Sequence, residues 1–330
     1  MSNGELNILL TGATGFIGSA LVARLCTCPD VKLTVVVREE SNFPEGVKQE
    51  RISSLESEAN WEKIVRGMQI VVHCAGLAHV KTGAKYEDYL SINATATKDI
   101  ACAAKREGVE HFIFLSTVKV HGERSFGMEK IDEDSPYNPK DFYSKSKVIA
   151  ELDLMALAQD SEFGYTIIRP PMVYGPASKG NFQLLEKMIR WNLPLPIGLI
   201  ESKRSFISVK NLVHFICLCI DNPKSKNEAF VVSDGKDLST LELSILLRQS
   251  MKSRSIFVPF PVSLLKIFLT AIGKGTLVGK FADRFQLRIE KSTNLMGWKA
   301  PQTPKEAIDE TQTFVKPFKS SHRGTNNGRL

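Results

Sequence analysis

The sequence shows no pattern typical of a signal peptide or of a membrane-spanning helix. Its first apolar run, Leu6 to Leu10, leads directly into glycines and lacks the basic-then-apolar layout of a signal peptide. The most apolar later stretch, Ser255 to Gly279, is broken by two prolines and two lysines. Its longest uncharged run has 11 residues, where about 20 are needed to cross a bilayer. We therefore predict no membrane span, buried or surface-docked helices in that stretch, and a cytoplasmic location.

Patterns typical of metal sites are also missing. The six cysteines show no CxxC spacing, and the two members of each CxC pair would point apart on a helix. Free cysteines in apolar surroundings are most often packed side chains. We predict no structural metal, and buried free thiols at Cys26, Cys28, Cys74, Cys102, Cys217 and Cys219.

The charges argue against nucleic acid as a partner. Lys+Arg total 43 and Asp+Glu total 36, which gives a net charge of +7, but the basic residues form no block of the kind that binds nucleic acid. A basic protein can equally bind an anionic small molecule. With 43% hydrophobic and 24% charged residues, the 330-residue chain has the composition of a folded protein of about two domains.

The first half of the chain alternates short β-branched runs with amphipathic stretches. This alternation is typical of βαβ units, so the predicted fold class is α/β, a doubly wound parallel sheet with a smaller C-terminal substrate-binding cap. The predicted strands are Leu6–Thr11, Lys32–Val37, Gln69–His73, His111–Ser116 and Tyr165–Arg169. The predicted helices, which would cover both faces of the sheet, are Phe16–Leu25, Trp61–Arg66, Tyr86–Glu107 and Tyr143–Gln159.

The pattern changes after Arg169, where five prolines cluster between shorter elements. We predict a sheet domain over residues 1–169. Residues 170–318 would mainly form a cap over the carboxyl edge of the sheet, with some elements returning to it. Residues 319–330 contain almost nothing apolar and are predicted to be disordered. The predicted helices of the second part are Phe182–Trp191, Val209–Cys219, Thr240–Met251, Val262–Ile272 and Lys305–Phe314.

Three glycines follow the first predicted strand and open the first predicted helix. In a dinucleotide-binding turn, one glycine makes the bend, one lets the backbone approach the pyrophosphate and one packs helix on strand, while the helix N-terminus attracts the phosphate charge. The position of the triplet in an alternating chain favours nucleotide binding over a purely structural turn. The residues of this turn that we predict to bind a cofactor are Gly12, Thr14, Gly15, Phe16, Ile17 and Gly18.

The motif TGATGFIG of this turn resembles that of the extended branch of the short-chain dehydrogenase/reductase superfamily. The resemblance covers residues 6 to 315. It implies a Rossmann NAD(P)-binding domain. The segment FLSTVKVHG resembles the strand-end SSxxVYG of the family, with His121 where tyrosine is usual. Counting back five residues from Gly122 gives Thr117 as the hydroxyl that bonds the substrate oxygen, and Ser116 as its structural neighbour.

Tyr143 and Lys147 stand four residues apart in YSKSK, a spacing that puts both on one helix face. An ammonium beside a phenol favours the phenolate, so we expect Lys147 to lower a pKa that is about 10 in a model peptide. The predicted catalytic residues are therefore Thr117, Tyr143 and Lys147. Hydride would move between nicotinamide and a carbonyl or carbinol carbon, while Tyr143 gives or takes the proton of the oxygen.

The resemblance implies further cofactor contacts. VVHCAG resembles the family segment VxHxAa, which places Ala75 against the cofactor, while His73 inside this apolar strand is expected to be packed rather than a base. Asn93 matches an asparagine that supports the active site, although it could equally be a polar helix residue. Pro170 is predicted to border the cofactor, and Lys147 to bind its ribose. Ser54 stands where relatives often have an aspartate that meets the adenine.

Arg38 follows the second predicted strand, where an acidic residue would bind the 2′-hydroxyl of NAD. A guanidinium suits a 2′-phosphate, so NADP(H) is favoured over NAD(H). Glu39 and Glu40 come next and could supply a ribose carboxylate, and Arg38 could also be a solvated charge at a strand end.

The second part of the chain resembles members that process nucleotide-diphosphate sugars. RPPMVYGP matches the family RPxxVYGP, and Asn181 follows it at the place of an asparagine that meets the diphosphate, with a bare N-cap as the alternative. KRSFISV resembles RDFIHV, which makes Arg204 the diphosphate clamp. Near the end, we expect one of Arg284 and Arg288 to reach the nucleotide and the other to be a surface charge. Arg284 is our choice for the substrate site.

Two activities fit these residues. The preferred one is the NADPH-dependent reduction of a UDP-4-keto-6-deoxy-N-acetylhexosamine, forming UDP-N-acetylquinovosamine for surface polysaccharide. The alternative is a UDP-glucose or UDP-N-acetylglucosamine 4-epimerase with tightly bound NAD. A 4,6-dehydratase fits less well, because Val118 and Lys119 stand where those relatives have acidic residues. A catalytically silent dinucleotide-binding regulator would leave the Tyr143 and Lys147 pair unexplained. The two long helices of the first half resemble a family dimer face, so a homodimer is possible.

Overall fold

The computed structural model describes residues 5–56, 60–78, 84–125, 129–178, 180–271, 279 and 282–313. A seven-stranded sheet lies at its centre, with the strand order β10-β6-β5-β4-β1-β2-β3. All neighbouring pairs in this sheet are parallel. Its strands are β1 (Leu6–Thr11), β2 (Val31–Val37), β3 (Lys48–Arg51), β4 (Ile70–His73), β5 (His111–Leu115), β6 (Gly164–Arg169) and β10 (Glu228–Val231). The predicted doubly wound parallel fold is thereby confirmed.

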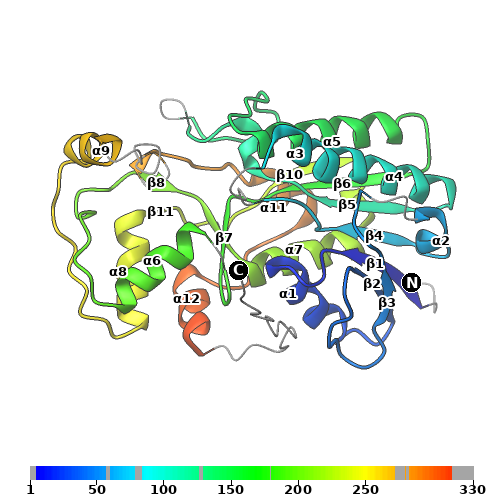
Figure 1. Cartoon of the computed structure of the whole chain (residues 1–330), viewed down its shortest axis with the longest axis horizontal. Helices are drawn as coiled ribbons and strands as arrows, with labels where there is room; N and C mark the ends of the chain where they lie inside the picture. The colour runs from blue at the N-terminus through cyan, green and yellow to red at the C-terminus, as the bar shows by residue number, and fades with distance from the viewer. Residues whose placement is uncertain are drawn as a thin grey trace, which may run out of the picture.

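Helices cover both faces of the sheet, as Figure 1 shows. On one face, α1 (Phe16–Leu25) and α7 (Val209–Asp221) pack against each other and on the apolar side chains of β1 and β2. On the other face lie α2 (Trp61–Val65), α4 (Ala96–Arg106) and α5 (Phe142–Ala158). The near-continuous apolar runs of the central strands follow from this double covering, because both faces of each strand are buried.

The predicted helix over Tyr86–Glu107 is not uniform. It consists of α3 (Tyr86–Leu90), a π-helical turn η1 (Ser91–Thr95) and α4. Such π turns are frequent at functional sites, and this one contains Asn93. Two strands of the central sheet lay outside the prediction. β3 is a short, charged edge strand, and β10 comes from the second half of the chain.

The second half contributes both to the sheet and to a separate core. α7 and β10 return to the sheet, while the other elements pack around Tyr174, Phe182 and Phe206. These elements are β7 (Met172–Tyr174), α6 (Asn181–Arg190), β8 (Lys203–Arg204), β9 (Phe206–Ser208), β11 (Leu238–Ser239), α8 (Thr240–Ser250) and α12 (Pro304–Thr313). α11 (Glu290–Met296) lies near β10. The predicted disordered tail, residues 319–330, falls outside the described residues.

The helix α9 (Val262–Ala271) lies at the surface, the second of the two alternatives predicted for this stretch, since Leu264, Ile267 and Phe268 all face solvent. The prediction of buried thiols was wrong for Cys26, which is exposed because it follows the last turn of α1. Cys219 is buried as expected, and the other four thiols are partly buried. In the described part of the chain, no helix is both long and apolar enough to span a bilayer.

Candidate active site

The glycine turn lies between β1 and α1 at the carboxyl edge of the sheet. Gly12 has a φ of +76°, and a Cβ there would come within 2.7 Å of the Ala75 nitrogen. A Cβ on Gly18 would overlap the Gly12 carbonyl, so the helix can pack this closely only with glycine. Gly15 is the N-cap of α1 and offers no side-chain cap, which leaves the first amides of the helix directed outward. This glycine turn, together with the uncapped amides of α1, fits the diphosphate of a dinucleotide.

The segment that follows β4 borders the same glycine turn. The amide of Ala75 donates to Thr11 Oγ1 at 3.3 Å, which fixes the segment beside the glycine turn. A Cβ on Gly76 would lie 2.9 Å from Asn93 Oδ1 and 3.4 Å from Lys147 Nζ. Three segments therefore converge on Gly76, which the sequence pattern had not singled out.

Asn93 joins the β4 exit to the helix α5. Its Oδ1 accepts from the Leu77 amide at 2.7 Å, and its Nδ2 donates to the Leu77 carbonyl at 3.1 Å and to Ser146 Oγ at 3.0 Å. With its donors and acceptor in use, Asn93 positions backbone rather than acting as a solvated helix residue. The π turn η1 presents this amide to both partners.

Thr117 and Tyr143 meet at the end of β5. Thr117 follows the strand in an extended conformation, and its side chain interacts electrostatically with the phenol of Tyr143. Tyr143 lies in the first turn of α5, which Asp141 caps by accepting from the Ser144 amide at 2.7 Å. The structure thus brings together the two hydroxyls that the sequence placed 26 residues apart.

Lys147 lies one turn further along α5 and is buried. Its Nζ donates to the Leu115 carbonyl at 2.9 Å and lies 4.3 Å from the centre of the Phe114 ring. Burial lowers the pKa of this ammonium to about 8, while Cys74 and Glu151 act in the opposite direction.

The expected lowering of the Tyr143 pKa is not found. Burial raises the pKa of the phenol, the negative charge of Asp141 adds to this, and the interaction with Thr117 opposes it. The physical reason is that desolvation penalises the phenolate. Tyr143 is therefore protonated at neutral pH.

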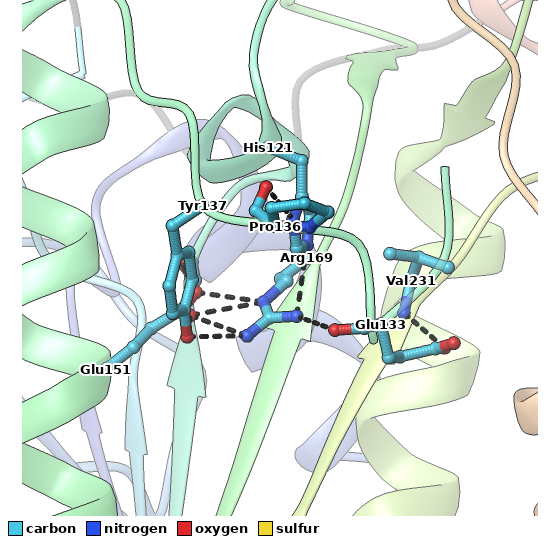
Figure 2. A network of polar contacts seen from close by, with 8 residues as sticks. His121, Glu133, Pro136, Tyr137, Glu151, Arg169 and Val231 are labelled. Atoms are coloured by element: carbon cyan, nitrogen blue, oxygen red, sulfur yellow. Dashed lines mark hydrogen bonds and ion pairs between the residues drawn. The ribbon is translucent and has the colours of Figure 1, made fainter. Parts of the chain in front are cut away.

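The side chain of Ser116 joins a buried polar network through Glu151. Figure 2 shows Glu151, Arg169, Tyr137 and His121 of this network. The Oγ of Ser116 donates a very short hydrogen bond to Glu151. Glu151 and Arg169 form an ion pair at 2.8 Å with exposed fractions of 0% and 2%. Arg169 also donates to the Tyr137 hydroxyl and the Glu133 carbonyl, each at 2.9 Å. The sequence had shown Arg169 only as part of RPPMVYGP, and it gave no signal for Glu151.

His121, at the position of the usual family tyrosine, belongs to the same network. Its ring stacks on Tyr137 at 5.8 Å with an angle of 4°. Arg169 Nη1 lies 3.1 Å from His121 Nε2, and His121 Nδ1 lies 3.2 Å from the Pro136 carbonyl. This pattern requires a neutral ring that donates from Nδ1. Burial and the charge of Arg169 lower the pKa of His121 accordingly.

His73 is packed and satisfied. Its two ring nitrogens lie 2.7 Å from Thr11 Oγ1 and 3.0 Å from Thr97 Oγ1. Burial, together with the positive charge of Lys147, lowers its pKa to about 3. The ring therefore stays neutral, and its structural contacts leave no free nitrogen for a base.

The predicted substrate residues gather in the second core. Asn181 and Arg204 both line a small cavity between α6 and β8. Arg204 Nη1 donates to the Asp283 carbonyl at 2.5 Å, and its guanidinium lies 5.4 Å from the centre of the Phe285 ring. Burial lowers its pKa to about 10. Phe285 forms a β-bridge with Arg204, which brings the neighbouring Arg284 to the same region.

Arg288 lies elsewhere. Its half-exposed side chain pairs with Asp132 at 3.3 Å. Of the two arginines near the end of the chain, Arg284 is thus the one beside Arg204.

The remaining predicted cofactor residues border the glycine turn or the strand ends. Thr14 is exposed, and Phe16 and Ile17 are partly buried against the core. Pro170 is buried after β6, and its carbonyl accepts from the Val118 amide at 3.0 Å. Arg38 is exposed just after β2, and among the described residues its guanidinium has no ion-pair partner. No group of three or more histidine, cysteine or acidic residues in the described segments could bind a metal ion.

Comparisons with known proteins place these features among related chains. The NAD dependent epimerase/dehydratase family matches residues 8–233. A UDP-glucose 4-epimerase of Vibrio cholerae is 37% identical over 315 residues, which cover 94% of this chain and 96% of the relative. An N-acetyl-α-D-glucosaminyl-diphospho-ditrans,octacis-undecaprenol 4-epimerase of Escherichia coli O157:H7 is 27% identical and covers 93% of this chain and 95% of the relative.

Solved structures share the fold. The UDP-glucose 4-epimerase of Thermotoga maritima with UDP-glucose superposes with a TM-score of 0.76 at 23% identity, covering 93% of this chain and 97% of that one. A UDP-glucuronic acid 4-epimerase of Bacillus cereus in complex with NAD gives a TM-score of 0.76 at 18% identity, covering 93% and 96%.

Proposed function

This chain belongs to the NAD dependent epimerase/dehydratase family, and from that premise we propose that it inverts C4 of a UDP-hexose or UDP-N-acetylhexosamine. The observation that supports this most directly is that Tyr143 interacts with Thr117 at the end of β5, on the edge of the sheet that also carries the glycine turn. The relative from Vibrio cholerae, named as a UDP-glucose 4-epimerase, matches over nearly its whole length. This reverses the order of preference that the sequence alone favoured.

In this proposal each residue of the cluster has a defined role. Tyr143 exchanges a proton with the C4 oxygen of the sugar, and Thr117 donates a hydrogen bond to the same oxygen. Lys147 binds the ribose hydroxyls of the dinucleotide and keeps a positive charge near the phenol. The dinucleotide, when bound, supplies the hydride chemistry at C4.

The diphosphates of cofactor and substrate would lie at different places. The cofactor diphosphate would meet the turn of Gly12 and Gly15 with the amides of α1. The substrate diphosphate would meet Arg204, with Asn181 and Arg284 nearby. Both groups are anionic, which agrees with the net charge of +7.

Arg38 supports a second candidate activity, the NADPH-dependent reductase. An exposed guanidinium after β2, without an ion-pair partner among the described residues, fits the 2′-phosphate of NADPH. That would suit the reduction of a UDP-4-keto-6-deoxy-N-acetylhexosamine, in which the cofactor is exchanged at each turnover. The neutral phenol of Tyr143 is also ready to donate to a ketone.

Product analysis separates the two activities. Purified protein is mixed with UDP-glucose or UDP-N-acetylglucosamine without added cofactor, and NMR follows the appearance of the C4 epimer. A parallel reaction contains UDP-4-keto-6-deoxy-N-acetylglucosamine and NADPH. Epimer formed without added cofactor supports the 4-epimerase, whereas NADPH oxidation with reduction of the keto sugar, and no epimer in the first reaction, would replace it with the reductase.

A further inference from the structure

The helix α9 exposes large apolar side chains to solvent. Leu264, Ile267 and Phe268 have exposed fractions of 51%, 66% and 61%. In the described part of the chain, α9 packs extensively against no other helix or strand, and Figure 1 shows it at the end of the molecule far from β1 to β3. Isolated exposed leucines are common, but a cluster of large ones on one helix marks an interaction surface.

The segment before α9 has further exposed apolar side chains. Ile256 and Val258 are also exposed, and the Gly198 amide donates to the Val258 carbonyl at 2.9 Å. That bond places the exposed Leu199 beside Val258. We call the following six residues the α9 surface: Leu199, Ile256, Val258, Leu264, Ile267 and Phe268.

Five of the six residues of the α9 surface lie in a stretch of the sequence that has basic residues and no acidic residue. Between Glu242 and Asp283 the sequence has six basic residues and no acidic residue. Of these, Lys252, Arg254 and Lys266 are described and exposed. Glu201, after Leu199, is the exposed acid next to the surface in the sequence.

We propose that the α9 surface docks this protein on an anionic phospholipid bilayer. α9 has 10 residues, too few to cross a membrane, but apolar side chains interleaved with lysine suit a helix that lies in the interface. The acid-free basic segment matches the negative surface of such a bilayer. A second copy of this chain would bring the same positive charges together, which disfavours that occupant.

Docking would bring the membrane beside the Arg204 site. Arg204 Nη1 contacts the carbonyls of Gly279 and Asp283, which follow α9 in the chain, at 3.4 Å and 2.5 Å. The surface and the site thus share one segment. The docking proposal does not depend on which sugar is used, and binding is tested without turnover.

Vesicle flotation with the full chain tests the proposal. One set of vesicles contains phosphatidylcholine alone, and the other contains phosphatidylcholine and phosphatidylglycerol at 7:3. We expect the wild type to float with the anionic vesicles, and 1 M NaCl to weaken this binding. The Ile267→Ser/Phe268→Ser double variant should bind about tenfold more weakly or worse, because it removes the two most exposed apolar side chains of α9. Lys266→Glu should also reduce binding to anionic vesicles about tenfold.

Matched controls distinguish the surface from general hydrophobicity. Leu264→Ser is compared with Leu184→Ser on α6, because the two leucines are exposed by 51% and 48%. Only Leu264→Ser should weaken binding, and both should keep the wild-type Tm because neither side chain is buried. If the wild type stays in the vesicle-free fraction, the proposal is overturned. It is also overturned if the double variant floats with the anionic vesicles as well as the wild type does. A dimer that the double variant dissociates would likewise overturn it, since a second copy would then cover α9.

Discussion

At the scale of single residues, the hydroxyl of Tyr143 is the group that we propose exchanges a proton with the substrate. Tyr143→Phe keeps the ring and removes only this hydroxyl, which interacts with Thr117. We expect kcat to fall at least about 10²–10⁴-fold, the usual effect of losing an acid/base group, with cofactor affinity unchanged within a few-fold. Steady-state rates and a fluorescence titration with the dinucleotide measure the two effects. Near-normal kcat would contradict the assignment.

The neighbouring hydroxyls serve as controls for that variant. Thr117→Val should also slow turnover, because Thr117 faces Tyr143. Ser116→Ala should slow it less, because the Ser116 hydroxyl faces Glu151 on the other side of the strand end. If Ser116 proved the more damaging position, the substrate oxygen would have to lie elsewhere.

A variant of Arg38 tests which cofactor the protein prefers. Arg38→Ala should weaken the binding of NADPH much more than that of NADH, because only NADPH carries the phosphate that the guanidinium would meet. The two dissociation constants, measured for both proteins, provide the test. Equal changes would make Arg38 a solvated charge and strengthen the 4-epimerase proposal.

Arg204 should act on substrate binding alone. Arg204→Ala removes a charge-assisted contact of roughly 1.5–3 kcal/mol, or about 10- to 150-fold in affinity, so KM for the UDP-sugar should rise by that factor. The diphosphate keeps its charge throughout the reaction, so kcat should change little. Arg204→Lys should recover only part of the loss, because an ammonium lacks the planar fork. An unchanged KM in the alanine variant would show that the diphosphate binds elsewhere.

At the scale of elements, α5 presents Tyr143, Lys147 and Glu151 at successive turns of one face. The first two face the proposed site, and Glu151 pairs with Arg169 of β6. Together with the bond from Ser116, this pair connects α5 to the ends of β5 and β6. The catalytic helix and the strand ends are therefore positioned by buried polar contacts as well as by apolar packing.

Removing one partner of that ion pair tests how much the pair contributes to the free energy of unfolding. Glu151→Gln should lower the free energy of unfolding by about 3–5 kcal/mol, because the Arg169 charge stays buried without its counter-charge. Asp153→Asn on the same helix is the control. Asp153 pairs with Lys98 at 3.2 Å near the surface, so its loss should cost at most about 1 kcal/mol. Urea unfolding of the three proteins gives both values, and equal losses would contradict the buried-pair argument.

The elements also show which features the sequence could reveal. The glycine turn and the Tyr143 and Lys147 spacing were predicted because they are local patterns within one turn of chain. The Arg169 and Glu151 pair joins residues 18 apart, and the Asn93 contacts join three separate segments, so neither has a local signature. β10 was missed because its four residues pair with β6 across 62 positions. The exposure of α9 could not be read from its composition, since a buried helix would show the same apolar residues.

At the scale of the whole molecule, two buried histidines link folding to pH. Burial lowers the pKa of His73 to about 3 and that of His111 to about 4, with smaller effects from Lys147 and Lys226 respectively. Histidines of the unfolded chain protonate near pH 6.5, so below that pH the unfolded state binds more protons than the folded state. Stability is therefore complete above about pH 6.5 and decreases as the pH falls toward the folded-state pKa values.

The variant His111→Gln isolates one of these contributions. Glutamine can still donate to Thr166 Oγ1, which lies 2.7 Å from His111 Nε2, but it does not titrate. Between pH 7 and pH 5 each buried histidine should cost the folded state about 2 kcal/mol, so the wild type should lose about 2 kcal/mol more than the variant over this interval. Urea unfolding of both proteins at the two pH values gives the difference directly, because all other titrating groups are shared and cancel. Equal losses would mean that His111 is protonated in the folded state as readily as in the unfolded one, which would require water to reach the ring between β5 and β6.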